Sequence, residues 1–364
     1  MIDEKLILNK IDKNDFRGLD VSQYDFLDWQ SILSQENKNL MFDSKTIFPN
    51  SVKKQFQTRL ENAKTRGPYI AELHNKGYTG KGITVAIIDH KLRTTHNDIK
   101  NNIIHYEEIG KMPAEPEMHG PAVSSILCGK NGILPDAKLV YFATPSGENF
   151  SIDNDIKAIY KIIEYNKTLP EENKIKVISI SSGLCDGKTT TEEKLKETIS
   201  VCRDNDIFIA FTGIRTFYNI PFVGTDRIID SDLNDTQNYK ECIFFSERKN
   251  MVVKDAICVP QDRITLASHT GDNDYFYDTQ GGMSWAVPYF AGIYALAKNI
   301  DKSMTPKKFY DLALSTGDNV LIRNGKNSFI NPVKIVKSLE FEKSNNIIEN
   351  KLNNHINIGN VNDR

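Results

Sequence analysis

Short apolar runs alternate with longer amphipathic segments along the middle of the chain. Runs rich in β-branched and aromatic residues predict buried strands near residues 83–88, 138–143, 175–181, 207–212 and 256–260. Segments with helical spacing predict helices near residues 119–128, 152–167, 191–204 and 284–299. Strands that alternate with helices are typical of a parallel sheet covered by helices on both faces. The pattern therefore predicts an α/β fold.

The two ends of the chain depart from this alternation. Residues 1–66 are polar with short apolar clusters, and we expect an N-terminal extension that is either a pro-segment or a permanent strap over the body. Residues 67–345 hold the alternating pattern and form the main domain. Residues 346–364 are polar and rich in Asn, so we expect a disordered tail. The polar stretch 215–250 is predicted to be a long irregular loop beside the site.

Three residues with catalytic side chains stand where predicted elements begin or end. Asp89 closes the strand of residues 83–88, and ligands of open α/β sheets bind outside the carboxyl ends of strands. His119 opens a helix, and Ser284 lies at the start of an apolar helix. The order Asp, His, Ser is one of the chain orders known for the Ser-His-Asp machinery. The sequence therefore predicts Ser284 as nucleophile, His119 as base and Asp89 as the carboxylate that orients the base.

Five short motifs around these residues resemble those of the subtilisin-like serine peptidases, the subtilases of type S8. Residues 87–89 are similar to the family's Asp motif, 118–123 to HGTxVA, 132–137 to GVAPxA, 178–183 to the substrate-binding strand and 282–288 to GTSMAxP. The resemblance implies a three-layer subtilisin-like fold with a mostly parallel central sheet. It also implies a serine endopeptidase that hydrolyses peptide bonds through an acyl-enzyme. The N-terminal extension resembles those of some intracellular bacterial members.

The resemblance also implies where a polypeptide substrate would bind. The residues concerned form two segments: Ser181, Ser182 and Gly183, and Phe211, Thr212 and Gly213. The first segment would offer backbone groups to an extended peptide, as in the addition of a strand to a sheet edge. The second would line the pocket for the side chain before the scissile bond. Phe211 replaces a small residue of the family, so it either narrows this pocket or turns into the core.

Two departures from the family concern stabilisation of the oxyanion. Where subtilases have an Asn whose amide donates to the oxyanion, this chain has Ile214, and where they have a Thr before the nucleophile it has Met283. Removing one such donor from a subtilisin costs about 2.7 to 4 kcal/mol. The polar side chains close to the lost position are Arg215, Thr216 and Asn219. The chain is therefore either an active peptidase, which the complete triad favours, or a degenerate subtilase that binds a peptide or regulates a partner.

Composition limits the classes of protein to which the chain can belong. The chain has 364 residues, of which 39% are hydrophobic and 26% charged, enough for one full core. A net charge of −2 gives no general attraction to nucleic acid or to anionic membranes, and no run of apolar residues has the length of a membrane span. The first residues lack the pattern of a signal peptide, and the five scattered cysteines favour reduced thiols. We therefore expect a cytoplasmic protein.

No cofactor and no metal ligand set is predicted. Family members often bind calcium, but no Asp cluster here has the spacing of a calcium site. His90 follows Asp89 where the family has a small residue, and it is interpreted as a solvated loop histidine. A doubly wound nucleotide-binding protein would share the sheet, but no G-x-G-x-x-G follows the strand of residues 83–88. The expected partner is a polypeptide substrate, and the sequence makes no prediction of the oligomeric state.

Overall fold

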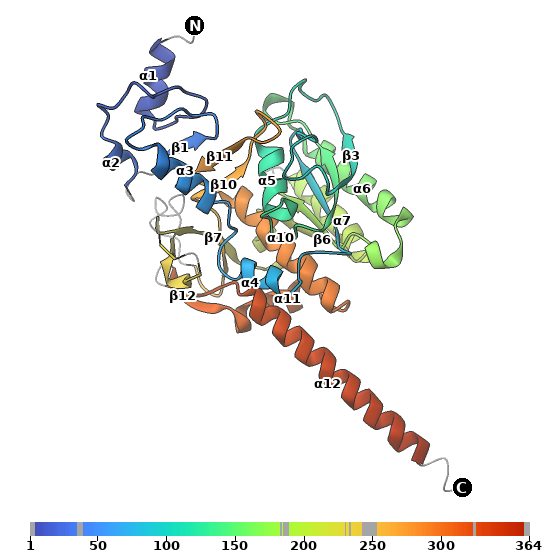
Figure 1. The fold of residues 1–364 in the computed structure, drawn as a ribbon. Helices are drawn as coiled ribbons and strands as arrows, with labels where there is room; N and C mark the ends of the chain where they lie inside the picture. The colour runs from blue at the N-terminus through green and yellow to red at the C-terminus, as the bar shows by residue number, and fades with distance from the viewer. Residues whose placement is uncertain are drawn as a thin grey trace.

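A parallel five-stranded sheet forms the centre of the protein (Figure 1). The computed structural model describes residues 4–34, 39–182, 184, 189–229, 231–232, 234–241, 253–322 and 325–359. Across the sheet the strands are β3 Ile103–Glu108, β4 Lys138–Ala143, β2 Thr84–Asp89, β5 Val177–Ile180 and β6 Phe208–Phe211. All four pairings are parallel, and every residue of β2 is buried. The α/β fold predicted from the apolar runs is confirmed.

Helices cover both faces of this sheet (Figure 1). They are α5 His119–Cys128 and α10 Met283–Ile300 on one face, and α6 Ile152–Thr168 and α7 Thr189–Asp204 on the other. Two short 3-10 helices, η1 Gly147–Asn149 and η2 Glu171–Asn173, flank α6. The central helix α10 is buried from Trp285 to Lys298, because it is apolar on nearly all sides and packs on α5, β5 and β6.

A second five-stranded sheet lies beside the first. Its order is β12 Asp318–Ile322, β13 Gly325–Phe329, β9 Ile257–Pro260, β7 Phe222–Arg227 and β8 Tyr239–Glu241. The strand predicted near 256–260 thus pairs here. The described part of 215–250 contains β7, β8, η3 Thr236–Asn238 and most of α8 Ile214–Tyr218, so the expectation of one irregular loop is wrong there. The strand formers Phe222 and Val223 let β7 pair with β9.

The N-terminal region is folded into the body. It consists of α1 Glu4–Asp12, α2 Trp29–Ile32, β1 Met41–Asp43 and α3 Lys53–Asn62. Strand β1 pairs with β11 Tyr275–Asp278, which also pairs with β10 Ile264–Ala267. The small core of this region includes Phe16, Trp29, Phe42, Phe48 and Phe56, and it is completed by Tyr277 of β11. The extension is therefore joined to the strand that leads towards Ser284.

The predicted boundary between extension and main domain falls at a buried residue. Arg66 is 2% exposed, and it donates to the carbonyl oxygens of Thr265 and Ser125 at 2.7 and 3.3 Å. The backbone N–H of Thr265 in turn donates to the Ala63 carbonyl at 2.9 Å. Helix α4 Ile70–Asn75 follows and packs against α12. The chain around residue 66 is therefore packed into the body.

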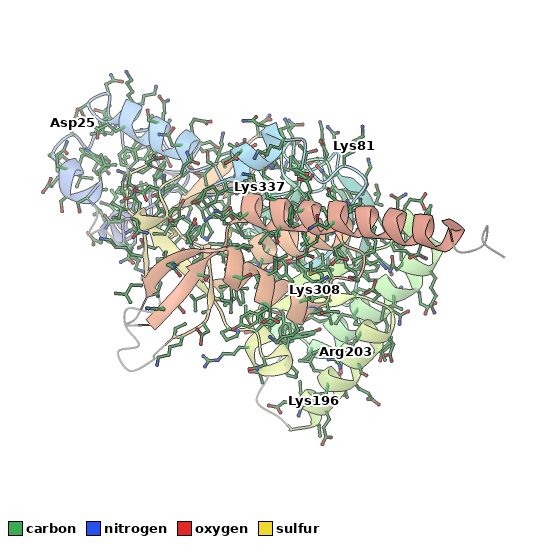
Figure 2. The ribbon with its side chains drawn as sticks, turned by 90° about the horizontal axis from the view of Figure 1, so that it is seen from below. Asp25, Lys81, Lys196, Arg203, Lys308 and Lys337 are labelled. Carbon is green, nitrogen blue, oxygen red and sulfur yellow. The ribbon has the colours of Figure 1, made fainter. Side chains whose placement is uncertain are left out.

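Two helices complete the chain, α11 Pro306–Thr316 and α12 Pro332–Gly359. Helix α12 projects from the body in Figure 1, and Figure 2 shows it from below with Lys337 labelled near its beginning. It continues past residue 345, where a disordered tail was expected, because no Gly or Pro interrupts residues 333–358. No helix in the described part of the chain combines the length and hydrophobicity that a membrane span needs.

Candidate active site

The three predicted catalytic residues lie on three elements that meet at the carboxyl edge of the central sheet. Asp89 is the last residue of β2, His119 the first of α5 and Ser284 the second of α10. The start of α5 approaches β2 closely at Gly120. A Cβ atom there would lie 2.5 Å from the carbonyl oxygen of His90, so only glycine allows the approach. The close contact between β2 and α5 brings the aspartate and the histidine together.

Asp89 and His119 form a direct pair. Nδ1 of His119 lies 2.6 Å from Oδ1 of Asp89, whose side chain is 4% exposed. Burial alone would raise the pKa of Asp89, but the charges and hydrogen bonds of His119 and His90 together outweigh it and lower that pKa. Burial would likewise lower the pKa of His119, but the charge and hydrogen bond of Asp89 raise it. This bond keeps the proton on Nδ1, so Nε2 carries the lone pair that a general base needs.

Ser284 is tied to the end of β5 by two reciprocal hydrogen bonds. Its Oγ donates to the carbonyl oxygen of Ser181 at 3.1 Å, and its own carbonyl oxygen accepts from Oγ of Ser181 at 2.8 Å. In a regular helix the Ser284 carbonyl would accept the backbone N–H of residue 288, but a proline stands at that position and has no N–H. The Ser181 hydroxyl therefore takes the place of the missing helical donor.

The Ser284 hydroxyl is not bonded to His119 in this structure. Among the described residues its Oγ has the Ser181 carbonyl as acceptor, and no hydrogen bond joins it to His119. A rotation of the serine side chain is needed before the proton can pass. Catalytic hydrogen bonds are often absent or long without substrate, and they form in the Michaelis complex.

The turn before Ser284 depends on two glycines. Gly281 has φ +61° and Gly282 has φ +156°, and both values lie in the region that favours glycine. A Cβ atom on Gly281 would also lie 2.2 Å from the carbonyl oxygen of Gln261. The sequence Gly281-Gly282 is therefore required for the chain to leave β11 and enter α10 at Ser284.

Trp285 and Asp278, which were not predicted as site residues, support the same turn. The indole Nε1 of Trp285 donates to Oδ2 of Asp278 at 3.0 Å, and the indole ring lies 5.1 Å from the imidazole of His119. Oδ1 of Asp278 accepts the backbone N–H groups of Gln280 and Gly281 at 3.0 and 3.3 Å. One signal was present in the sequence, because the family motif GTSMAxP has Met where Trp285 stands.

Comparisons with known proteins concern the fold of the chain. Residues 80–215, which contain Asp89 and His119, match the model of the subtilase family, peptidase S8. The fold is similar to that of the prenylagaramide maturation protease PagA, with 16% sequence identity and a TM-score of 0.51. The comparison covers 75% of this chain and 98% of PagA. The chain has the subtilase fold. The resemblance predicted from the five motifs is confirmed.

Two further solved structures show the same fold. The PatG macrocyclase domain is 18% identical with a TM-score of 0.50, and the comparison covers 75% of this chain and 95% of that one. A cold-adapted subtilisin-like serine proteinase is 15% identical with a TM-score of 0.50, and the comparison covers 70% and 90% of the two chains. At these identities the likeness concerns the architecture, so the chemistry has to be argued from the residues of this chain.

The oxyanion amide that is typical of subtilases has no equivalent at Ile214. This residue is 0% exposed and packs in the main core at the start of α8. Of the nearby polar residues, Arg215 is exposed, while Thr216 and Asn219 line a cavity of about 550 Å³ whose lining includes none of the triad residues. The backbone N–H of Ser284, in the first turn of α10, remains as a donor for an oxyanion.

The segments expected to bind substrate are only partly placed as predicted. Ser182 accepts two hydrogen bonds at its carbonyl oxygen, from the N–H of Thr212 at 3.3 Å and from its Oγ1 at 2.9 Å. Phe211 is 0% exposed and packs against Phe217, so its assignment to the substrate pocket is wrong and it belongs to the core. Gly183 lies outside the described residues. Thr212 is half-buried and joins the two expected walls of the pocket.

One cluster of possible metal ligands occurs in the described part of the chain. Asp89, His90 and His119 each offer a donor atom, and these atoms lie within 4.8 Å of one another. No metal ligands were predicted from the sequence, and His90 was expected to be a solvated loop residue. The structure instead places the His90 ring 4.9 Å from the ring of His119.

Proposed function

We propose that this protein is a serine endopeptidase in which Ser284, His119 and Asp89 act as a catalytic triad. The observation that carries the proposal is the 2.6 Å bond between Asp89 and His119 beside the first turn of α10, which presents Ser284. A buried Asp–His pair with a raised histidine pKa is the arrangement that a general base requires. The subtilase fold of the chain supports this assignment.

The proposed reaction has two halves. Oγ of Ser284 attacks the peptide carbonyl carbon while its proton passes to Nε2 of His119, and the C–N bond breaks as this proton passes to the leaving amine. A water molecule then attacks the resulting ester, with His119 again accepting and returning a proton. Asp89 stabilises the imidazolium in both halves and does not itself take the proton.

Stabilisation of the oxyanion is the weak part of this machinery. The backbone N–H of Ser284 and the positive end of α10 support the negative oxygen, while the core side chain of Ile214 contributes no donor. We expect turnover roughly 10² to 10³ lower than that of a subtilase with the amide donor, by the cost of one missing donor.

The proposed substrate is a polypeptide in extended conformation. The segment that follows β5, including Ser181 and Ser182, would pair with the substrate backbone. Thr212 bridges to the Ser182 carbonyl and occupies space between the two pocket walls. We therefore expect a preference for small side chains before the scissile bond. No organic cofactor takes part in this scheme.

A second candidate function is peptide binding without turnover. Two observations favour it: Ile214 is buried where a donor is needed, and Ser284 Oγ donates to the Ser181 carbonyl instead of to His119. Such a protein would bind an extended peptide or regulate a partner through the same surface. The Asp89–His119 pair supports the peptidase instead, because binding alone does not require it.

A cytoplasmic location is part of the proposal. The described cysteines Cys128, Cys202 and Cys258 are free and buried, and burial raises the pKa of the Cys202 and Cys258 thiols to about 12. Buried thiols of this kind are unreactive and fit a reducing compartment.

Labelling with a fluorophosphonate probe tests the peptidase proposal. The folded native chain is expected to take up one probe molecule, which peptide mapping locates at Ser284, and Ser284→Ala is expected to remain unlabelled. A heat-denatured sample controls for non-specific reaction, because an activated serine requires the folded site. Absence of labelling at Ser284 in the folded native chain would refute the proposal and favour peptide binding.

A further inference from the structure

The loop that follows β2 places a second imidazole beside the proposed catalytic histidine. The rings of His90 and His119 have centroids 4.9 Å apart and planes inclined by 37°. A donor atom of Asp89 completes the group, with all three donor atoms within 4.8 Å of one another. His90 stands where the family motif has a small residue, so this arrangement comes from the sequence of this chain.

The backbone beneath the His90 ring is held in place from several sides. Its N–H donates to Oδ1 of Asp89 at 2.8 Å, and its carbonyl oxygen accepts the hydroxyl of the buried Tyr141 at 2.5 Å. Gly120 of α5 packs against the same carbonyl. The ring itself is half-buried and makes no hydrogen bond to any described residue. Its position is therefore fixed at the backbone, while its nitrogens are available to a ligand.

We propose that His90 and His119 together bind a divalent transition-metal ion of the Zn²⁺ class. His119 would use Nε2, since Nδ1 is engaged by Asp89, and the remaining coordination positions would be taken by water. Tetrahedral zinc with Zn–N bonds of about 2.0 to 2.1 Å needs donor nitrogens roughly 3.4 Å apart. The centroids of the two imidazole rings lie 4.9 Å apart, so the rings are close enough to share one ion after side-chain adjustment. Imidazole donors favour zinc, copper and nickel over calcium and magnesium.

The Asp89–His119 bond suits this role as well. Metal-ligating histidines usually donate their second ring N–H to a carboxylate, which fixes the ring and increases the basicity of the ligating nitrogen. Here Asp89 accepts that bond at 2.6 Å and is itself held by the N–H of His90. Asp89 therefore orients His119 as a metal ligand, while His90 supplies the second imidazole.

Metal binding at this position would inhibit the peptidase reversibly. A metal on Nε2 of His119 occupies the lone pair that accepts the proton of Ser284, so zinc and catalysis exclude each other. This consequence rests on the proposed function, whereas the binding of the metal does not. The two parts can therefore be tested separately.

Calorimetric titration of the full chain carrying Ser284→Ala with Zn²⁺ tests binding without any activity. One Zn²⁺ per chain is expected. In the same background His90→Ser is expected to weaken binding by at least about 100-fold, and Asp89→Asn by about 10- to 100-fold. The matched control is His105→Ser, because His105 also has a carboxylate nearby, with its Nε2 3.6 Å from Glu107, but belongs to no such cluster.

Two results would overturn the metal site. One is an affinity of the His90→Ser variant that equals that of the parent while circular dichroism shows both folded. The other is the absence of zinc binding by the folded parent. A loss of affinity in His105→Ser as large as that in His90→Ser would likewise contradict it, because the ion would then be held elsewhere.

Fluorophosphonate labelling with and without saturating Zn²⁺ tests the inhibition. Zinc is expected to suppress labelling of the native chain, and a chelator is expected to restore it. The His90→Ser variant should be labelled at the same rate with zinc as without it. If zinc binds as predicted but Ser284 is never labelled, the peptidase proposal fails and the metal site stands. If Ser284 is labelled equally with zinc bound, the inhibitory role is refuted.

Discussion

The hydrogen bond between Trp285 and Asp278 is expected to stabilise the turn that carries Ser284, the proposed nucleophile. Its partners are 3.0 Å apart and only 4% and 8% exposed, so water cannot easily replace either one. A hydrogen bond to a charged group contributes about 1.5 to 3 kcal/mol to stability. Trp285→Phe removes the donor and retains most of the ring, and is expected to lower the free energy of unfolding by an amount in that range.

A double-mutant cycle isolates this bond. Asp278→Asn preserves size but has one acceptor oxygen, which cannot serve both Trp285 and the backbone N–H groups of Gln280 and Gly281. Urea unfolding of the native chain, both single variants and the double variant gives the coupling energy. A coupling energy of about 1.5 kcal/mol or more is expected. Once one partner has been replaced the bond is already lost, so replacing the other partner costs less than it does in the native chain.

Variants of Trp285 also test the link between this turn and His119, the proposed general base. Trp285→Ala removes the ring that packs against His119, and the rate of fluorophosphonate labelling is expected to fall by about 10- to 100-fold through misplacement of the base. Trp285→Phe retains a ring there and should label faster than the alanine variant. A coupling energy below about 0.5 kcal/mol, the usual limit of additivity, would refute the role assigned to the bond. Equal labelling of the two Trp285 variants would refute the role of the ring.

Three further predictions concern the same site. The Asp89 carboxylate raises the pKa of His119, and activation of Ser284 requires neutral His119. Labelling should therefore rise with pH and reach half its maximum above the ordinary histidine pKa of about 6.5. A midpoint below that value would contradict the pairing of His119 with Asp89. Ser181→Ala leaves the Ser284 carbonyl without a donor and should cost about 1 to 3 kcal/mol in urea unfolding. Adding Pro288→Ala supplies a backbone N–H for the Ser284 carbonyl, so the double variant should lose less stability than the sum of the losses in the two single variants. Ile214→Asn should destabilise the chain by about 1 to 3 kcal/mol without faster labelling, since this side chain is directed into the core; faster labelling would show that it reaches the oxyanion.

The sequence predicted the central sheet and the positions of Asp89, His119 and Ser284 at the ends of their elements, because both depend on local signals. The β-branched run that ends at Asp89 could form little other than a buried strand, and the observed β2 Thr84–Asp89 agrees with the prediction within one residue. The motifs around His119 and Ser284 mark the beginnings of helices, and α5 and α10 begin at or next to these residues. Their meeting at one sheet edge follows from the topology of parallel strands.

The features that the sequence did not predict depend on contacts between distant segments. The N-terminal aromatic core is completed by Tyr277, which lies more than 200 residues away along the chain, so periodicity within residues 1–66 could not indicate it. The burial of Phe211 and Ile214 depends on which way each side chain turns at the end of β6 and just beyond it. The proximity of His90 to His119 likewise depends on how closely α5 packs against β2 at Gly120.

The most direct test of the proposed function is detection of the acyl-enzyme itself. The chain is mixed with an activated peptide ester, the reaction is stopped in acid, and the intact mass is measured. A mass increase of one acyl group that maps to Ser284 is expected in the native chain, and Ser284→Ala and His119→Ala should lack it. A native chain that binds the peptide and never gains this mass, even at long times, would contradict the catalytic role of the triad.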